Sequence, residues 1–83
     1  MKYRKKPKIV EAQLFRNALN GMEIAKWCHG EFQNRGQDCF ILIKTLEGNM
    51  LANIGDYIIK GVEGEFYPCK SSVFEKTYDK VED

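Results

Sequence analysis

The sequence predicts an α+β fold: a small antiparallel sheet of about five short strands with two helices, the C-terminal helix packed on the sheet. Apolar residues alternate with a period of two in residues 8–15, glycine turns separate short β-rich stretches in the second half, and two short segments have the spacing of helices. With 83 residues the chain can bury one modest core, so residues 1–83 are expected to form a single domain.

Composition excludes several classes of protein. Hydrophobic residues make up 43% and charged residues 30%, a balance typical of globular proteins. No apolar run approaches the roughly 20 residues of a membrane-spanning helix. The three cysteines are an odd number and match no disulfide framework, which favours a reducing compartment. We therefore expect a soluble, cytoplasmic protein with no membrane partner and no cofactor.

Positive charge is concentrated at the N-terminus. Five of the thirteen basic residues lie in the first eight positions, and all twelve acidic residues follow them. Such a segment can neutralise phosphates, so nucleic-acid binding through the basic N-terminus is one hypothesis. A solvated segment that keeps strand edges from aggregating is the more ordinary interpretation.

The first element expected is a strand over residues 8–15. Val10, Ala12 and Leu14 would share one of its faces, because side chains alternate along a strand. Pro7 cannot donate a ladder hydrogen bond, which indicates that this end of the strand lies at an edge of the sheet or outside it.

A short helix is expected over residues 21–29. Asn20 and Glu23 have the spacing of a capping box, and Gly30 could close the helix in a left-handed conformation. Residues 31–38 contain turn formers and no clear period, so a loop is expected there.

Two hairpins are expected next, giving four short strands in a meander. The first covers residues 40–53 and turns at Gly48, and the second covers residues 57–67 and turns at residues 61–64. A C-terminal helix then begins with Ser72 and Glu75 in a second capping box, and it should cover the sheet.

Two runs carry a resemblance to a known group of proteins. They are Gly-Asp-Tyr-Ile-Ile-Lys-Gly at residues 55–61 and Glu-Phe-Tyr-Pro-Cys-Lys at residues 65–70. Together with residues 1–7, they resemble an uncharacterised family of small proteins encoded by tailed bacteriophages and prophages, which commonly have proline at the position of Ile54. The resemblance implies a phage or prophage origin and the cytoplasm of a bacterial host, but no activity and no binding residue.

Metal binding and catalysis find little support in the sequence. Cys28, His29, Cys39 and Cys69 could supply four zinc ligands, but no Cys-x-x-Cys pair exists, and buried apolar cysteines are the simpler interpretation. A cysteine nucleophile with His29 as its base would lack a third group to orient the base.

The acidic residues Glu47, Asp56, Glu63 and Glu65 could serve a hydrolytic enzyme, which is the weakest of the alternatives. They lie at expected turns, where carboxylates usually remain solvated or accept backbone hydrogen bonds. We expect no enzyme and no catalytic residue.

The leading hypothesis is a non-enzymatic accessory protein that binds a host or phage macromolecule. An aromatic and basic surface around Tyr57, Lys60, Tyr67 and Lys70 would hold the partner.

A second hypothesis is the capture of a small signalling nucleotide between subunits of an oligomer. Arg4 and Lys5, together with those tyrosines, would line the site, since cations suit phosphates and aromatic rings suit bases. A homodimer or higher assembly would also protect the edges of so small a sheet.

Overall fold

The computed structural model of the chain describes residues 1–2 and 8–80. Arg4 and Lys5 of the expected site and Val81 of the expected C-terminal helix lie outside the described residues. The chain forms six strands and two helices, in the order β1 (Glu11–Leu14), α1 (Ala18–Cys28), β2 (Glu31–Arg35), β3 (Asp38–Thr45), β4 (Gly48–Asn53), β5 (Asp56–Lys60), β6 (Phe66–Lys70) and α2 (Ser71–Thr77). The α+β class and the packing of the C-terminal helix on a sheet are confirmed.

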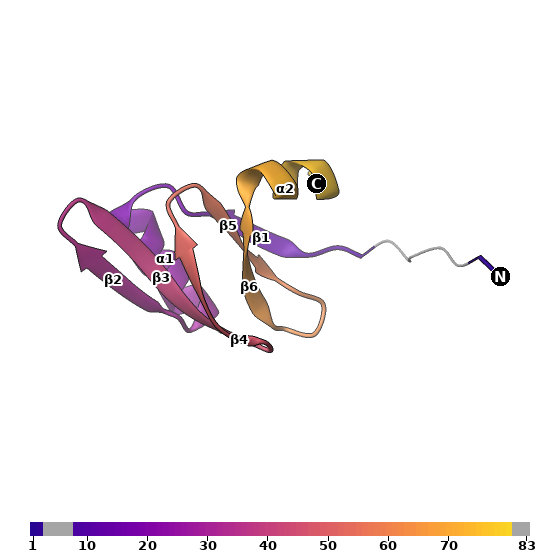
Figure 1. Ribbon diagram of the computed structural model, residues 1–83, viewed down its shortest axis with the longest axis horizontal. Helices are drawn as coiled ribbons and strands as arrows, with labels where there is room; N and C mark the ends of the chain where they lie inside the picture. The colour runs from indigo at the N-terminus through magenta and orange to yellow at the C-terminus, as the bar shows by residue number, and fades with distance from the viewer. Residues whose placement is uncertain (3–7, 81–83) are drawn as a thin grey trace.

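The strands form two antiparallel sheets of three strands each (Figure 1). One has the order β1-β5-β6 and the other the order β2-β3-β4. Strand β1 is an edge strand and begins only at Glu11, so residues 8–10 of the expected strand lie outside the sheet. The expected meander is wrong, because β4 and β5 follow each other in sequence but belong to different sheets. Gly55, with a φ of 102°, lies at the crossing between them, where a side chain would be strained.

Strand β2 was expected to be a loop. It pairs with β3 from Glu31 opposite Leu42 to Arg35 opposite Asp38. Of its five residues only Phe32 is apolar, and Phe32 packs against the core. The local pattern therefore had no visible period, and pairing with β3 stabilises the strand instead.

Helix α1 begins earlier than the sequence indicated. Asn17 is the N-cap, with an extended backbone, and its side chain accepts a hydrogen bond from the backbone N–H of Asn20 at 2.8 Å. Asn20 Oδ1 in turn accepts from the backbone N–H of Arg16 at 2.6 Å, so Asn20 completes the cap rather than starting it. At the other end His29, not Gly30, is left-handed, with a φ of 57°.

Gly30 is required for another reason. A Cβ added there would lie 2.9 Å from both Ile41 Cγ2 and the carbonyl oxygen of Leu42, so only glycine allows β3 to approach the end of α1 this closely. The main core lies at this junction, where α1 packs against strands of both sheets. Its buried members are Phe15, Ile24, Ala25, Cys28, Cys39, Ile41, Ile43, Ala52 and Ile58.

Helix α2 follows β6 without a loop. Its N-cap is therefore Lys70, and no side chain caps the helix, so the expected box of Ser72 and Glu75 is wrong. The helix packs against β5 and β6, whereas α1 packs against β2, β3 and β5 (Figure 1). Ile59 of β5 is fully buried outside the main core cluster, which indicates that residues around α2 cover a second, smaller apolar region.

Candidate functional site

The four residues of the expected binding surface that the structure describes lie on two opposite faces of the β1-β5-β6 sheet. Tyr57 stacks on Phe74 of α2, and Tyr67 lies opposite Ile59, two residues further along β5, so both tyrosines lie on the α2 face. Lys60 lies opposite Phe66, which packs edge-on against Trp27 of α1.

Lys70 lies opposite Asp56, on the same face of the sheet as Lys60. The two tyrosines are thus brought together, but the two lysines lie on the other side of the sheet. Each lysine is three residues from its tyrosine, and an odd separation along a strand always reverses the face.

Residues of α2 and its C-terminal end complete an aromatic cluster around the tyrosines. The ring centroids of Tyr57 and Phe74 are 3.9 Å apart at an interplanar angle of 14°, and those of Phe74 and Tyr78 are 5.0 Å apart at 29°. The hydroxyls of Tyr67 and Tyr78 are 3.5 Å apart. Burial and the hydrogen bond with Tyr78 raise the pKa of Tyr67 to about 12, so the hydroxyl of Tyr67 remains protonated at neutral pH.

A cavity of about 450 Å³ opens beside this cluster, between the segment that leads into β1 and the C-terminal end of α2. We call it the α2 pocket. Apolar and aromatic side chains line much of it, and its charged lining residues are Lys8, Asp79 and Lys80. Lys8 is also the last residue of the basic N-terminal segment. The sequence-based site missed Lys8, Phe74 and Lys80, which come from segments far from Tyr57 in the chain.

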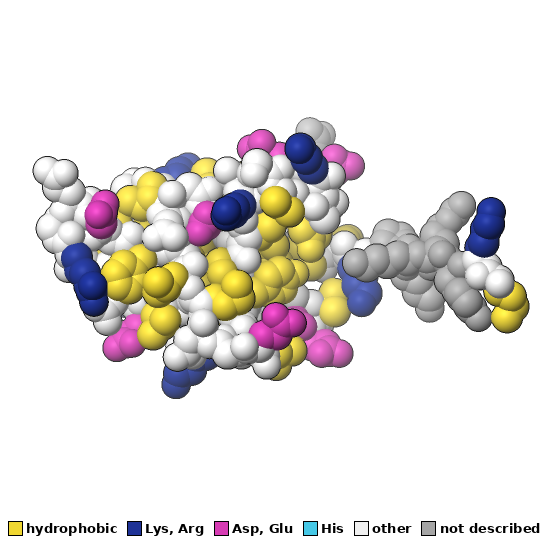
Figure 2. All heavy atoms as spheres, viewed as in Figure 1, with side chains coloured by type: hydrophobic (Ala, Val, Ile, Leu, Met, Phe, Trp, Pro, Cys, Tyr) yellow, Lys and Arg dark blue, Asp and Glu magenta, His cyan; other side chains and the backbone are white. Residues whose placement is uncertain are grey.

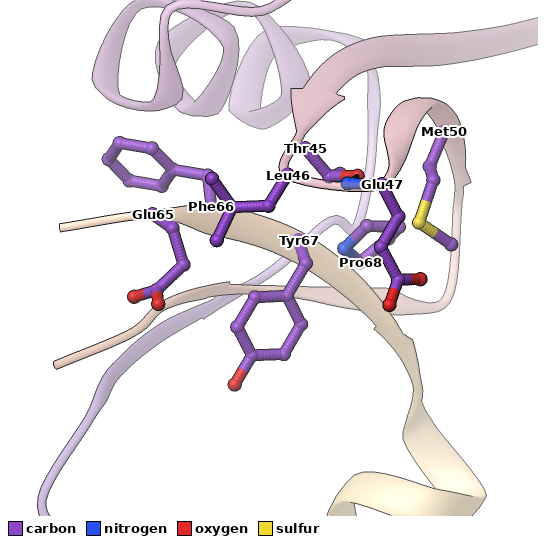
Figure 3. A pocket seen from close by; sticks show the side chains of 8 residues that line it. All are labelled: Thr45, Leu46, Glu47, Met50, Glu65, Phe66, Tyr67 and Pro68. Carbon is purple, nitrogen blue, oxygen red and sulfur yellow. Dashed lines mark hydrogen bonds between the residues drawn. The ribbon is translucent and has the colours of Figure 1, made fainter. Parts of the chain in front are cut away.

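A second cavity, of about 380 Å³, lies between the β3–β4 turn and β6 (Figure 3). Phe66 and Tyr67 point to different sides of β6 there, as their adjacent positions require. The acidic residues Glu47 and Glu65 also line it.

Two carboxylates of the proposed hydrolytic set accept backbone hydrogen bonds. Glu65 Oε1 accepts from the N–H of Glu63 at 3.1 Å, and Asp56 Oδ2 accepts from the N–H of Asn53 at 2.9 Å. These bonds satisfy backbone donors at turns, which was the ordinary interpretation of the acidic residues.

The cysteines are packing residues at two of their three positions. Cys28 and Cys39 are buried and Cys69 is half-buried, and none is in a disulfide. Burial raises the pKa of the Cys28 thiol, and burial followed by the nearby charge of Asp56 raises that of Cys69, so neither favours the thiolate needed for nucleophilic attack. Within residues 1–2 and 8–80 no three His, Cys, Asp or Glu side chains gather as a metal site would require.

No protein-family model matches the chain, and comparisons with curated proteins and with solved structures found no match. Neither helix of the described chain is long and apolar enough to cross a membrane.

Proposed function

We propose that this protein is a non-enzymatic binding module that holds an acidic segment of a macromolecular partner at the α2 pocket. The observation that carries the proposal is the combination of an apolar, aromatic lining with Lys8 and Lys80 in one cavity of about 450 Å³. Pockets that bind ligands commonly measure roughly 300–1,000 Å³ and combine an apolar lining with a few polar groups.

Charge is the argument for an acidic partner. The pocket has two lysines against the single carboxylate of Asp79, and Lys8 joins it to the strongly basic start of the sequence. An acidic segment could therefore contact Lys8 and Lys80 together, while an apolar or aromatic side chain of the segment enters the pocket.

The stacking geometry favours a peptide side chain over a nucleotide base. One ring face of Tyr57 is already covered by Phe74 at 3.9 Å, so these two rings form no slot in which a base could be sandwiched. Capture of a nucleotide remains the alternative in which Lys8 and Lys80 would bind phosphate, and nucleic-acid binding through the basic N-terminus is the third.

The proposal keeps the phage or prophage origin that the resemblance implies, and a cytoplasmic setting. Support for the setting comes from the thiols, since all three cysteines are unpaired and two are buried.

A matched pair of variants tests the proposal. Lys8→Gln/Lys80→Gln removes both positive charges from the pocket, and Lys60→Gln/Lys70→Gln removes two positive charges from the other face of the sheet. Tagged full-length baits would be used to capture host proteins, and an acidic segment of each retained protein would be titrated as a synthetic peptide. We expect the pocket variant to bind the peptide about tenfold more weakly and the control to bind normally.

Three outcomes would contradict the proposal. Equal binding by the two variants would show that the pocket is not the site. A larger loss in the Lys60→Gln/Lys70→Gln variant would return the site to the opposite face. Tight binding to a nucleotide or an oligonucleotide from a parallel panel, with no peptide bound, would favour one of the two alternatives.

A further inference from the structure

Exposed hydrophobic side chains gather along β4 and the turns at its two ends. Leu46 is 82% exposed, Met50 43%, Leu51 52% and Ile54 50%. Figure 2 shows hydrophobic side chains on the face that displays β3 and β4. A short edge strand that exposes this much apolar surface marks an interaction site.

Strand β4 is also the edge that lacks the usual protection. The other three edge strands each contain charged residues, and β6 contains Pro68 as well. Strand β4 reads Gly-Asn-Met-Leu-Ala-Asn, with no charge and no proline. Charged residues and proline are the common devices that keep one sheet edge from pairing with another. Strand β4 is therefore open to pairing at Asn49 and Leu51, while the carboxylate of Asp56 covers its end at Asn53.

The backbone of β4 has a defined set of free groups. The N–H of Asn53 points away from β3, because it donates to the carboxylate of Asp56. Orientation alternates along an antiparallel strand, so the backbone groups of Asn49 and Leu51 also point away from β3. Among the described residues, no hydrogen bond outside the strand ladders involves either backbone.

We infer that β4 is a self-association edge, at which two copies of this chain pair their β4 strands antiparallel about a two-fold axis at Met50. In this register Asn49 of each copy exchanges both backbone hydrogen bonds with Leu51 of the other. The free groups are therefore satisfied by each other, and Asn53 keeps its bond to Asp56.

The same register explains the exposed apolar side chains at the turns. Met50 lies opposite its counterpart, and the exposed Leu46 of one copy comes next to the exposed Ile54 of the other. Leu51, which lies opposite Leu42 on the outer face of the sheet, becomes a diagonal neighbour of Leu51 in the second copy. This self-complementarity is the reason that a second copy, rather than another protein, fits the edge.

Sedimentation equilibrium of the full chain tests the inference. The interface is small and belongs to the weak class, so the protein is measured from about 10 μM to about 1 mM. We expect a reversible rise toward the dimer mass. Leu51→Lys should abolish it by placing two ammonium groups beside each other. Leu19 of α1 is a still more exposed leucine, and Leu19→Lys should leave the association unchanged.

A cross-linking experiment tests the register. In a Cys69→Ser background, Met50→Cys should form a disulfide-linked dimer. The two copies of residue 50 form a directly opposite pair without hydrogen bonds between them, and the Cα atoms of such a pair are about 4.5 Å apart. Leu51→Cys should not, since the diagonal separation is about 7–8 Å. A protein that stays monomeric at every concentration, a dimer that survives Leu51→Lys, or cross-linking through position 51 rather than 50 would overturn the inference.

Discussion

The two sheets of this molecule differ in how their faces are covered. In β5 the adjacent residues Ile58 and Ile59 point to opposite faces, yet both are fully buried, because the main core covers one and the surroundings of α2 cover the other. In β3 burial alternates: Ile41 and Ile43 are buried, while Leu42 between them is only half-buried. The short helix α2 therefore gives the β1-β5-β6 sheet a second apolar region and the α2 pocket, whereas no helix of the described chain packs on the outer face of the β2-β3-β4 sheet.

The largest effects should come from the buried isoleucines. We expect Ile58→Ala and Ile59→Ala each to lower the free energy of unfolding by about 2–5 kcal/mol, because both delete fully buried methyl groups. In β3, Ile41→Ala should cost a similar amount, but Leu42→Ala about 1 kcal/mol or less. Urea unfolding of the four variants measures the comparison. An Ile59→Ala variant as stable as Leu42→Ala would mean that the α2 face is not covered.

Replacing Phe74 tests how much the aromatic cluster contributes to covering the sheet face on which α2 packs. Phe74→Ala removes the ring that stacks on both Tyr57 and Tyr78, and we expect a loss of about 1–2 kcal/mol in the free energy of unfolding. Val73 is an exposed neighbour on the same helix, so Val73→Ala should change stability by about 0.5 kcal/mol or less. Equal losses from the two variants would indicate that α2 contributes through helix formation and not through this stack.

Removing the N-cap side chain of α1 should destabilise the protein more than removing a side chain from the start of α2. Asn17→Ala deletes a side-chain oxygen that accepts a backbone hydrogen bond, and we expect a loss of about 1 kcal/mol. Ser72→Ala should cost less than about 0.5 kcal/mol, because no side chain caps α2. Thermal unfolding of both variants provides the measurement. A larger cost at Ser72 would contradict the assignment of Lys70 as the N-cap.

The smallest effect concerns the hydroxyl pair of Tyr67 and Tyr78. The pKa of Tyr67 is raised to about 12 from an ordinary value of about 10, because the folded protein favours the protonated hydroxyl. This preference stabilises the fold fully below about pH 10, and the stabilisation is lost as the pH rises from about 10 to about 12. Tyr78→Phe should lower the highest tyrosine pKa, because it removes the hydrogen bond but not the burial. Tyrosinate absorbance follows this titration. If the highest tyrosine pKa does not change in Tyr78→Phe, the hydroxyls of Tyr67 and Tyr78 do not form a hydrogen bond.

Local patterns in the sequence were sufficient for several elements. The turn at Gly48, the hairpin strands and the C-terminal helix follow from residues next to one another in the chain. Strand β2 could not be found this way, because its pairing with β3 is the stabilising interaction and its own residues are mostly polar. The division into two sheets depends on contacts between distant segments, which a local pattern does not encode.

The candidate site was predicted only in part. Tyr57 and Tyr67 were named and do share a face, but Lys60 and Lys70 were joined to them although their odd spacing already places them on the opposite face. The grouping of Lys8 and Lys80 with Tyr57 could not be found from the sequence, because the pocket forms where the segment that leads into β1 meets the C-terminal end of α2.

One amide NMR experiment on isotopically labelled protein tests the central claim, that the two sheets present two separate binding surfaces. Spectra are recorded first over a range of protein concentration and then during titration with an acidic peptide. We predict that concentration shifts the amides of Asn49, Met50 and Leu51, and that the peptide shifts those around Lys8, Tyr57 and Lys80. Shifts of the same residues in both series, or in neither, would contradict the account.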